Sequence, residues 1–357
     1  MKKARESNIE LLRILTMLGV VALHYNHADI GGAFAAVSPS SVSQVLLYIT
    51  ESIAIIAVNL FVLISGYFMC TSQKRNPWKI IFLILQVSVF SAGMYLLRVV
   101  LGADTFQVKS LVFSLVPANY FVLLYSAVYF ISPYLNILLQ KKTLTRGLLI
   151  TLGLLFSVWS TIVDFASDLT GLTVTGIHTV SSQGSQYGYT IVNFTLMYLI
   201  GGYLRLSEPK NIPTGRLLAA FLANTALMTA WALAGQWIGR PLDNSAWAYS
   251  NPLVIINAIL AFVLFRRIPL GEVKWINKLA EGAFTVYLLH AVFFRFLSIP
   301  KFAAMHPVVL LGHLIASCVG IYVACWCVYL VWQLVTRPIF TFLEKKFPLG
   351  LPEVPNE

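Results

Sequence analysis

The sequence predicts an all-α integral membrane protein with about ten transmembrane helices and with both termini in the cytoplasm. Three observations predict this fold: the composition, the recurrence of long apolar stretches and the placement of the basic residues. Of the 357 residues, 58% are hydrophobic and 11% are charged, and the mean hydropathy is +0.78. Globular domains carry roughly 25% charged residues, so the composition excludes an ordinary soluble domain.

A transmembrane helix needs about 20 consecutive apolar residues to cross a hydrocarbon core of about 30 Å. Such stretches recur along the whole chain, and counts of nine or eleven spans would also fit it. The ten predicted spans cover residues 9–28, 44–70, 79–101, 111–140, 147–165, 190–206, 215–238, 250–267, 282–300 and 308–335. The fourth is long, and Pro117 predicts its division into a short external element and the span itself.

The first apolar stretch is expected to remain in the protein as a helix. It contains Arg13 and His24 and lacks a small-residue cleavage site, so it does not fit a removed signal peptide. One membrane domain is expected over residues 1–346, followed by a short tail over residues 347–357.

The basic residues predict the orientation of these spans. With the N-terminus inside, nineteen Lys and Arg residues fall on the cytoplasmic side, and only Lys109, Arg240 and Lys301 fall in the opposite loops. Cytoplasmic loops of membrane proteins carry an excess of Lys and Arg. The distribution therefore favours ten spans with both termini in the cytoplasm.

The net charge of +11 does not indicate a nucleic-acid partner, because the basic residues are scattered between apolar stretches instead of forming one patch. The four cysteines lack the spacing of metal ligands. Neither a metal site nor a disulfide framework is expected. The longest external connection, from Asp164 to Tyr189, is interpreted either as a substrate-facing loop or as a solvated connector.

Arg13 and His24 are the most informative pair in the chain. Ionisable residues inside membrane spans are costly, and they usually face a bundle interior or a water-filled cavity. The two residues are eleven positions apart, which on an α-helix is about three turns. They therefore share one helix face about 16 Å apart along the axis, and we expect them to line one cavity.

The second span runs in the opposite direction, which places Glu51 near the depth of His24 and Ser65 near the depth of Arg13. A glutamate beside a histidine would favour the imidazolium or fix one tautomer, whereas a dry cavity would favour neutral forms of both. Glu51 is interpreted as a catalytic or orienting group, or as a plain interfacial carboxylate. Ser65 has no base at a local spacing, so lining a donor passage suits it better than nucleophilic attack.

The ninth span carries Tyr287 and His290, three positions apart and on one face. A lone histidine in a helix is more often a hydrogen-bonded structural residue than a catalyst. His290 is nevertheless a candidate for the site, together with Arg13, His24 and Glu51.

Three segments of the chain resemble the acyltransferase-3 family of membrane O-acyltransferases. Arg13 and His24 are similar to the Arg-x10-His signature of the family, the segment Phe61–Phe68 to its Phe-x-x-x-Ser-Gly-Tyr/Phe segment, and the segment Phe284–His290 to its late Tyr-Leu-x-His segment. The resemblance implies transfer of an acyl group, commonly acetyl, from cytoplasmic acyl-CoA to a hydroxyl of an extracytoplasmic or lipid-linked glycan. It implies site roles for Arg13 and His24, with Ser65 and Tyr67 as lesser candidates.

The segment after the second span departs from the family pattern. Relatives often carry paired arginines there, whereas this chain reads Lys74-Arg75-Asn76-Pro77-Trp78-Lys79. The basic character survives, and Lys74 and Arg75 are predicted to contact the donor.

The predicted mechanism needs a base and a holder for the donor. His24 is expected to act as a general base toward the acceptor hydroxyl, or to carry the acyl group briefly, while Arg13 holds anionic or carbonyl groups of acetyl-CoA. The partners expected are acyl-CoA, a glycan acceptor of the cell envelope and the bilayer, and a homo-oligomer is left open. The alternative functions are transport of a small polar solute such as an amino acid, and a non-catalytic scaffold.

Overall fold

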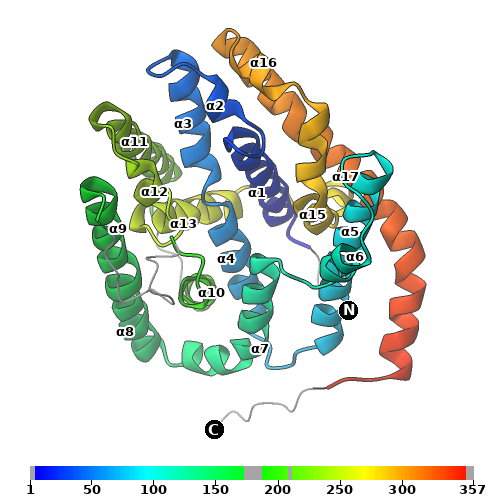
Figure 1. The fold of residues 1–357 in the computed structure, drawn as a ribbon. Coiled ribbons are helices and arrows are strands. Elements are labelled where there is room, and N and C mark those ends of the chain that lie inside the picture. The colour runs from blue at the N-terminus through cyan, green and yellow to red at the C-terminus, as the bar shows by residue number, and fades with distance from the viewer. Residues whose placement is uncertain (1–4, 173–186, 208–210, 351–357) are drawn as a thin grey trace.

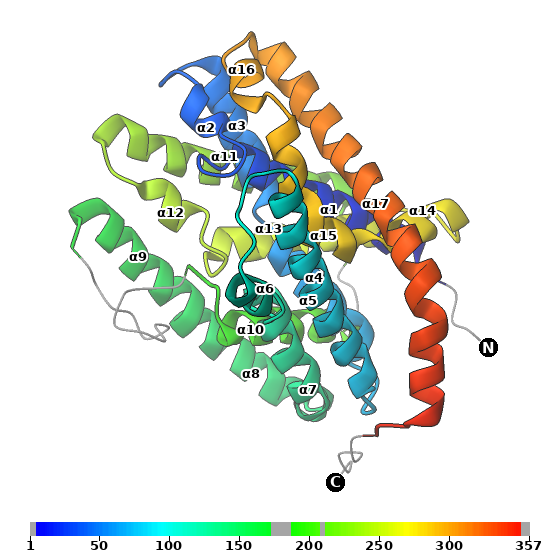
Figure 2. The same ribbon diagram turned by 45° about the vertical axis from the view of Figure 1, so that its right-hand side comes forward.

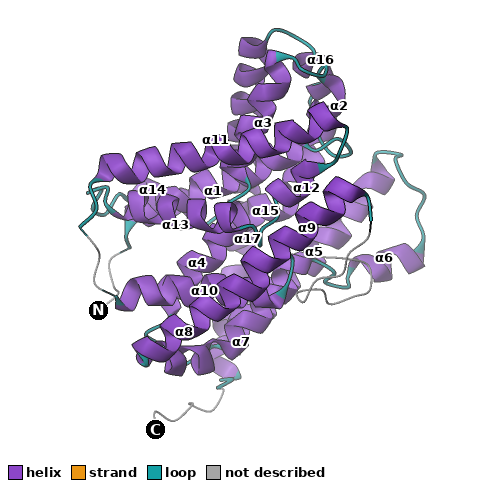
Figure 3. Ribbon diagram, turned by 90° about the vertical axis from the view of Figure 1, so that its left-hand side faces the viewer, coloured by secondary structure: helices purple, strands orange, loops and turns teal. Residues whose placement is uncertain are grey.

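The structure is a computed structural model, and it describes residues 5–172, 187–207 and 211–350. Across these residues the regular structure is entirely helical, without any strand (Figure 3). The helices are α1 (Ser7–Asn26), α2 (Ala33–Ala36), α3 (Val42–Ala54), α4 (Ala57–Met69), α5 (Pro77–Val100), α6 (Val108–Ser114), α7 (Tyr120–Gln140), α8 (Lys142–Gly153), the π-helical turn η1 (Leu154–Val158), α9 (Trp159–Thr170), α10 (Ile191–Leu206), α11 (Thr214–Ile238), α12 (Leu242–Ala246), α13 (Pro252–Arg266), α14 (Lys274–Ala280), α15 (Ala283–Phe293), the 3-10 turn η2 (Phe294–Phe296), α16 (Ile299–Ala303) and α17 (Pro307–Lys346). The all-α expectation is confirmed.

Seven helical segments of the described chain are long and apolar enough to cross a membrane, and an eighth is added if α14 and α15, bent by 57°, count as one. This is fewer than the ten spans expected. The difference lies in α10 and α13, which occupy the predicted spans 190–206 and 250–267 but have only 16 and 15 residues. Helices of that length are shorter than a bilayer core of about 30 Å.

The predicted break in the fourth apolar stretch is confirmed. The chain forms α6, leaves helical geometry after Leu115 and begins α7 at Tyr120. The side chain of Asn119 caps the new helix by accepting a hydrogen bond from the amide of Val122 at 3.1 Å, which satisfies one of the free donors of the first turn. Pro117 thus stands in a true interruption between two helices.

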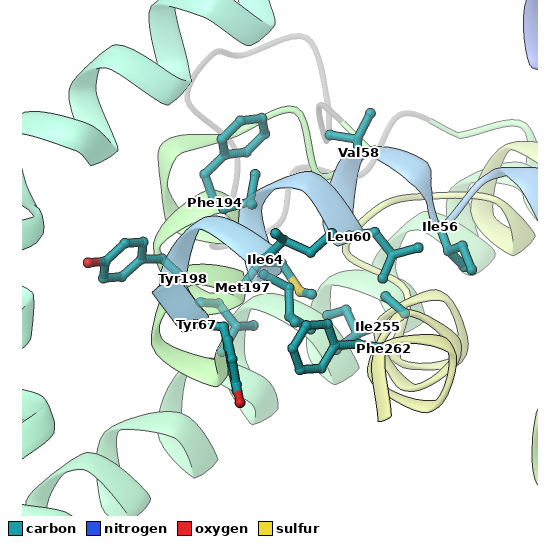
Figure 4. Close-up of a cluster of buried hydrophobic side chains, with 14 of the residues drawn as sticks. Ile56, Val58, Leu60, Ile64, Tyr67, Phe194, Met197, Tyr198, Ile255 and Phe262 are labelled. Atoms are coloured by element: carbon teal, nitrogen blue, oxygen red, sulfur yellow. The ribbon is translucent and has the colours of Figure 1, made fainter. Parts of the chain in front are cut away.

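One of the two large buried clusters surrounds α4, which packs closely against α10 (Figure 4). Two glycines permit this close approach. A Cβ atom on Gly66 would lie 2.1 Å from the carbonyl oxygen of Tyr198, and one on Gly201 would lie 2.1 Å from that of Leu63. Small residues at such crossings let helix backbones approach each other in membranes.

The other large cluster surrounds α1, which packs against α3, α4, α13, α14, α15 and α17 (Figure 1). The first helix is therefore central, and its face that carries Arg13 and His24 looks into the bundle. By contrast, α5 is peripheral, since its buried residues are only Ile80, Val87 and Ala92.

The last helix, α17, runs along the edge of the molecule beside α15 and α5 (Figure 2). Its 40 residues correspond to about 60 Å at 1.5 Å per residue, roughly twice the thickness of a bilayer core. One end of α17 must therefore project beyond the apolar layer. Near its C-terminal end, Glu344 accepts a hydrogen bond from Asn76 at 3.2 Å, which ties this end to the start of α5.

Candidate functional site

A cavity of about 960 Å³ lies between α1, α4, α5, α7, α15 and α17. Sites for small molecules and cofactors occupy about 300–1,000 Å³, so this cavity has room for a large ligand. Arg13 of α1 and Ser65 of α4 both line it. The depth that the sequence suggested for these two residues is consistent with their meeting in one cavity.

The face of α1 that Arg13 occupies continues along the wall of the cavity. Met17 and Val20 line it as well, and His24 is the next residue at the same helical spacing. His24 is not itself among the lining residues. It lies one turn beyond Val20, outside the lining, while Arg13 stands near Glu10, with 3.5 Å between Nη1 and Oε2.

His24 meets His290 of α15 just beyond the cavity lining, and His290 is not a lining residue either. The Nε2 atom of His290 lies 2.9 Å from Nδ1 of His24, and the ring centroids are 4.7 Å apart. His290 is 4% exposed, and its neighbour Tyr287, whose ring centroid lies 6.4 Å away, lines the cavity. The two histidines predicted separately from two distant spans therefore form one pair.

The partners of the two rings fix their neutral tautomers. Nδ1 of His290 lies 2.9 Å from the carbonyl oxygen of Val286, and Nδ1 of His24 lies 3.0 Å from that of Val20. A carbonyl oxygen only accepts, so both Nδ1 atoms carry the hydrogen and Nε2 of each ring bears a lone pair. Nδ1–H of His24 also faces Nε2 of His290, which leaves Nε2 of His24 as the basic atom of the pair.

Glu51 does not contact His24, although both were expected at the same depth. Its Oε2 atom accepts a hydrogen bond of 2.7 Å from Nδ2 of Asn26, the last residue of α1. Asn26 also donates to Thr50 over 3.3 Å. Equal depth did not bring the two side chains together because Glu51 and His24 point to different sides of their helices.

The side chains of Ser65 and Tyr67 point in different directions from α4. The hydroxyl of Ser65 donates to the carbonyl oxygen of Phe61 at 2.9 Å while the residue lines the cavity. Tyr67 is 4% exposed in the core (Figure 4) and accepts a hydrogen bond from Arg205 at 2.9 Å. Tyr67 therefore lies behind the cavity wall and is not among the lining residues.

Lys74 and Arg75 are likewise not among the residues that line the cavity. Lys74 is exposed, whereas Arg75 is only 7% exposed. The guanidinium of Arg75 donates to the hydroxyl of Ser132 at 2.7 Å and to the carbonyl oxygens of Met69, Ser72 and Lys74. This geometry ties the end of α4 to α7.

The sequence did not single out the basic residues that do line the cavity. They are Arg5, Lys79, Lys278 and Arg337, in addition to Arg13. In the sequence each was one of many cytoplasmic basic residues. Their convergence depends on the packing of α1, α5, α14 and α17, which no local spacing reveals. Among the described residues, no three His, Cys, Asp or Glu side chains gather in a way that would hold a metal ion.

The fold and the site define a class of protein: a multi-pass helical protein with ionisable side chains around an internal cavity. Within that class, the model of a family described as an acyltransferase domain matches residues 6–332 of the chain. The chain therefore belongs to the acyltransferase-3 family. Neither the curated proteins nor the solved structures contain a match to it. The family assignment establishes a membrane acyltransferase, with an acyl donor and an acceptor.

Proposed function

We propose that the protein transfers an acyl group, in the simplest case acetyl, from acyl-CoA to a hydroxyl of a cell-envelope glycan, in a bacterial plasma membrane. The observation that carries this proposal is the position of the His24–His290 pair, about one helical turn beyond Val20 and Tyr287, which line a cavity of about 960 Å³ that is also lined by Arg5, Lys79, Lys278 and Arg337. That arrangement suits a long donor with an anionic end and a reactive end.

The orientation supports a cytoplasmic donor. The basic lining residues Arg5, Lys79, Lys278 and Arg337 lie in or next to segments that are predicted to face the inside of the cell. The start of α1 and the end of α17 border the same cavity. With both termini cytoplasmic, the donor enters from the inside and the histidine pair lies deeper in the membrane.

The proposed chemistry begins with Nε2 of His24, which accepts the proton of the acceptor hydroxyl. The oxygen attacks the thioester carbon, the carbonyl π electrons move to its oxygen, and collapse of the tetrahedral species expels the thiolate. The thiolate takes the proton from the imidazolium of His24, so free CoA and the ester are the products. The neutral His290 ring accepts from Nδ1–H of His24 and holds the base in the required tautomer.

Two further residues are assigned supporting roles. Arg13 binds carbonyl groups of the donor's arm, which its fixed fork of donors suits, at about 16 Å from His24 along the helix. Glu51, held by Asn26, orients hydroxyl groups of the acceptor. Ser65 lines the cavity through which the donor's arm would pass.

The test is acceptor-stimulated release of CoA by the purified protein in lipid nanodiscs. We expect thiol release from acetyl-CoA to rise when acceptor glycan is added, and to fall to background in His24→Ala. Unchanged stimulated release in a folded His24→Ala protein would exclude the role of His24. If the variant still transfers the acyl group and a covalent acyl-enzyme is detected in it, a residue other than His24 carries the acyl group.

Transport of a small polar solute is the second candidate function. One observation favours it: α14 and α15 form a bent pair at 57°, and interrupted helices are common in transporters. Uptake of solute into proteoliposomes without any consumption of acyl-CoA would establish this function. Acceptor-dependent CoA release would establish the enzyme.

A further inference from the structure

We propose that the nucleotide end of the donor binds between α5 and α17, with its phosphates on Lys79 and Arg337 and its base on the aromatic pair Phe82–Phe340. The Lys74–Arg75 segment then does not hold the phosphates. This inference rests on the proposed function, because it locates one end of acyl-CoA in the same cavity.

Few hydrogen-bond donors of the Arg75 guanidinium remain for a phosphate. Besides its bonds to Ser132 and to three carbonyl oxygens, its Nη2 atom lies 3.5 Å from the hydroxyl of Tyr198. With only 7% of the residue exposed, a ligand could reach it only if the end of α4 came apart. The positive charge that meets the donor must come from residues that face the cavity.

Most of the charges on the cavity wall already neutralise one another. Glu281 accepts from Arg5 and from Lys278, each at 3.0 Å, and Glu10 lies 3.5 Å from Arg13. The third lining carboxylate, Glu344, accepts from Asn76 at 3.2 Å. The acidic side chains of the wall are thus engaged with protein groups.

Lys79 and Arg337 differ in their ion pairing from the basic lining residues that have acidic partners. Within residues 5–172, 187–207 and 211–350, neither has a carboxylate at ion-pair distance. The ammonium of Lys79 lies 5.2 Å from the ring centroid of Tyr129. Both side chains line the cavity, one from α5 and the other from α17. Two cations without acidic partners on facing helices form a site suited to phosphate groups.

An aromatic cluster lies one helical turn along α5 and α17 from these two cations. The rings of Phe82 and Phe340 stack with centroids 3.8 Å apart and an interplanar angle of 7°, and both line the cavity. Trp78 stacks on Phe82 at 5.2 Å, and Trp332 meets Phe340 edge-on at 6.3 Å. Phe82 and Phe340 cover each other's facing sides, and Trp78 covers the second side of Phe82. A planar base would therefore stack on the outer side of Phe340 or insert between the two rings, which a base of any identity can do, and the phosphates would then lie beside Lys79 and Arg337.

The length of the cavity fits the rest of the donor. On α1 the lining runs from Glu10 to Val20, which corresponds to about 15 Å along the axis. The pantetheine arm of CoA has a chain comparable to about four extended residues, roughly 14 Å. A base at the α5–α17 end therefore places the thioester near Val20 and Tyr287, next to the His24–His290 pair.

The first experiment measures binding of CoA and of adenosine 3′,5′-bisphosphate to the full chain in nanodiscs. Lys79→Gln and Arg337→Gln are expected to weaken both ligands about tenfold or more each, since hydrogen bonds to charged groups are lost. Phe340→Leu is expected to weaken them about tenfold through lost stacking. Lys142→Gln and Arg146→Gln, which change exposed cations of α8 outside the cavity, are the matched controls and should bind as the wild type does.

The second experiment compares acetyl-CoA with S-acetylpantetheine, which lacks the nucleotide. Arg337→Gln should raise the KM for acetyl-CoA about tenfold while leaving the KM for S-acetylpantetheine unchanged. The inference would be overturned if the Lys79 and Arg337 variants bound CoA as tightly as the wild type does. It would also be overturned if Lys74→Gln alone lost affinity tenfold. In both cases the binding of CoA would still support the proposed function. Absence of CoA binding by the wild type would overturn both.

Discussion

At the scale of single residues, the proposed chemistry depends on where the hydrogens of the His24–His290 pair lie. Two carbonyl oxygens, one from each helix, place the hydrogens on the Nδ1 atoms of His24 and His290. Because Nε2 of His290 lies 2.9 Å from Nδ1 of His24, the second ring accepts from the first. In the proposed mechanism His290 is therefore a positioning residue, which acts on the reaction through His24.

The first residue-scale prediction concerns His290. His290→Leu removes the acceptor for Nδ1–H of His24, and we expect kcat to fall about 10²-fold, at the lower end of the contribution of general base catalysis. His290→Gln supplies a carbonyl oxygen near the position of Nε2 and should recover much of the lost kcat. Both variants should keep the KM for acetyl-CoA, and steady-state kinetics of purified proteins measures the split.

A structural role alone would give a different pattern for His290. In that case both variants would lose thermal stability in proportion to activity, and glutamine would not restore kcat selectively. Size-exclusion profiles and unfolding temperatures of the two variants in detergent provide the control.

The second residue-scale prediction concerns Arg75. Arg75→Gln leaves the carbonyl oxygens of Met69 and Ser72 without a charged donor, so we expect a loss of about 2 kcal/mol or more in stability. Thermal unfolding in detergent measures it, and the affinity of the folded fraction for CoA should stay at the wild-type value. A variant with normal stability and strongly weakened CoA binding would show that Arg75 contacts the donor.

At the scale of elements, the contact between α4 and α10 holds the cavity wall in place. The Ser-Gly sequence of α4 performs two tasks: Ser65 faces the cavity, and Gly66 faces Tyr198 of α10. The wall residue can keep its position only if the helix behind it stays close. The glycine is therefore as important to the site as its lining neighbour.

A prediction at this scale is that Gly66→Ala strongly destabilises the protein. The new Cβ atom would lie 2.1 Å from a carbonyl oxygen, and the forced separation of the helices is expected to cost about 1–3 kcal/mol or more. Unfolding temperatures of purified variants measure this cost. Gly93→Ala on α5 is the control, because nothing lies within 4 Å of a Cβ atom there, and it should be neutral or slightly stabilising. Equal effects of the two substitutions would show that α4 and α10 are not packed this closely.

At the scale of the whole molecule, the sequence predicted a helical membrane protein and the residues on the inward face of α1, because composition and helical periodicity carry that information. It could not predict the His24–His290 pair, since the two residues are 266 positions apart and only packing unites them. Counting residues from the ends of the spans placed Ser65 and Arg13 at one depth, and both line one cavity. The same count placed Glu51 beside His24, which it does not contact, because depth does not determine the direction of a side chain around its helix.

Two other differences have physical causes. The last predicted span ended at residue 335, whereas α17 continues through Pro338 to Lys346. That extension carries Arg337 to the cavity. The short helices α10 and α13 are apolar enough to be predicted as spans but too short to cross alone. The connection predicted over residues 164–189 is described only at its two ends: residues 164–170 continue α9, and residues 173–186 lie outside the described residues.

The orientation of the whole molecule gives a further prediction. Single cysteines introduced at Lys109 and at Lys142, in a background without the native cysteines, should react oppositely with a membrane-impermeant maleimide added to intact cells. Lys109→Cys should react at once, because its loop is predicted outside, and Lys142→Cys only after permeabilisation. Immediate reaction at position 142 would reverse the orientation and place the cavity mouth outside.

The proposal that this family member esterifies envelope glycans through His24 is tested most directly by mass spectrometry of those glycans. Cells that make the wild-type protein are compared with cells that make His24→Ala at the same membrane level. We predict that one class of glycan carries an acyl mass increment in the first strain and lacks it in the second. Identical acylation of every glycan class in the two strains would contradict the proposal.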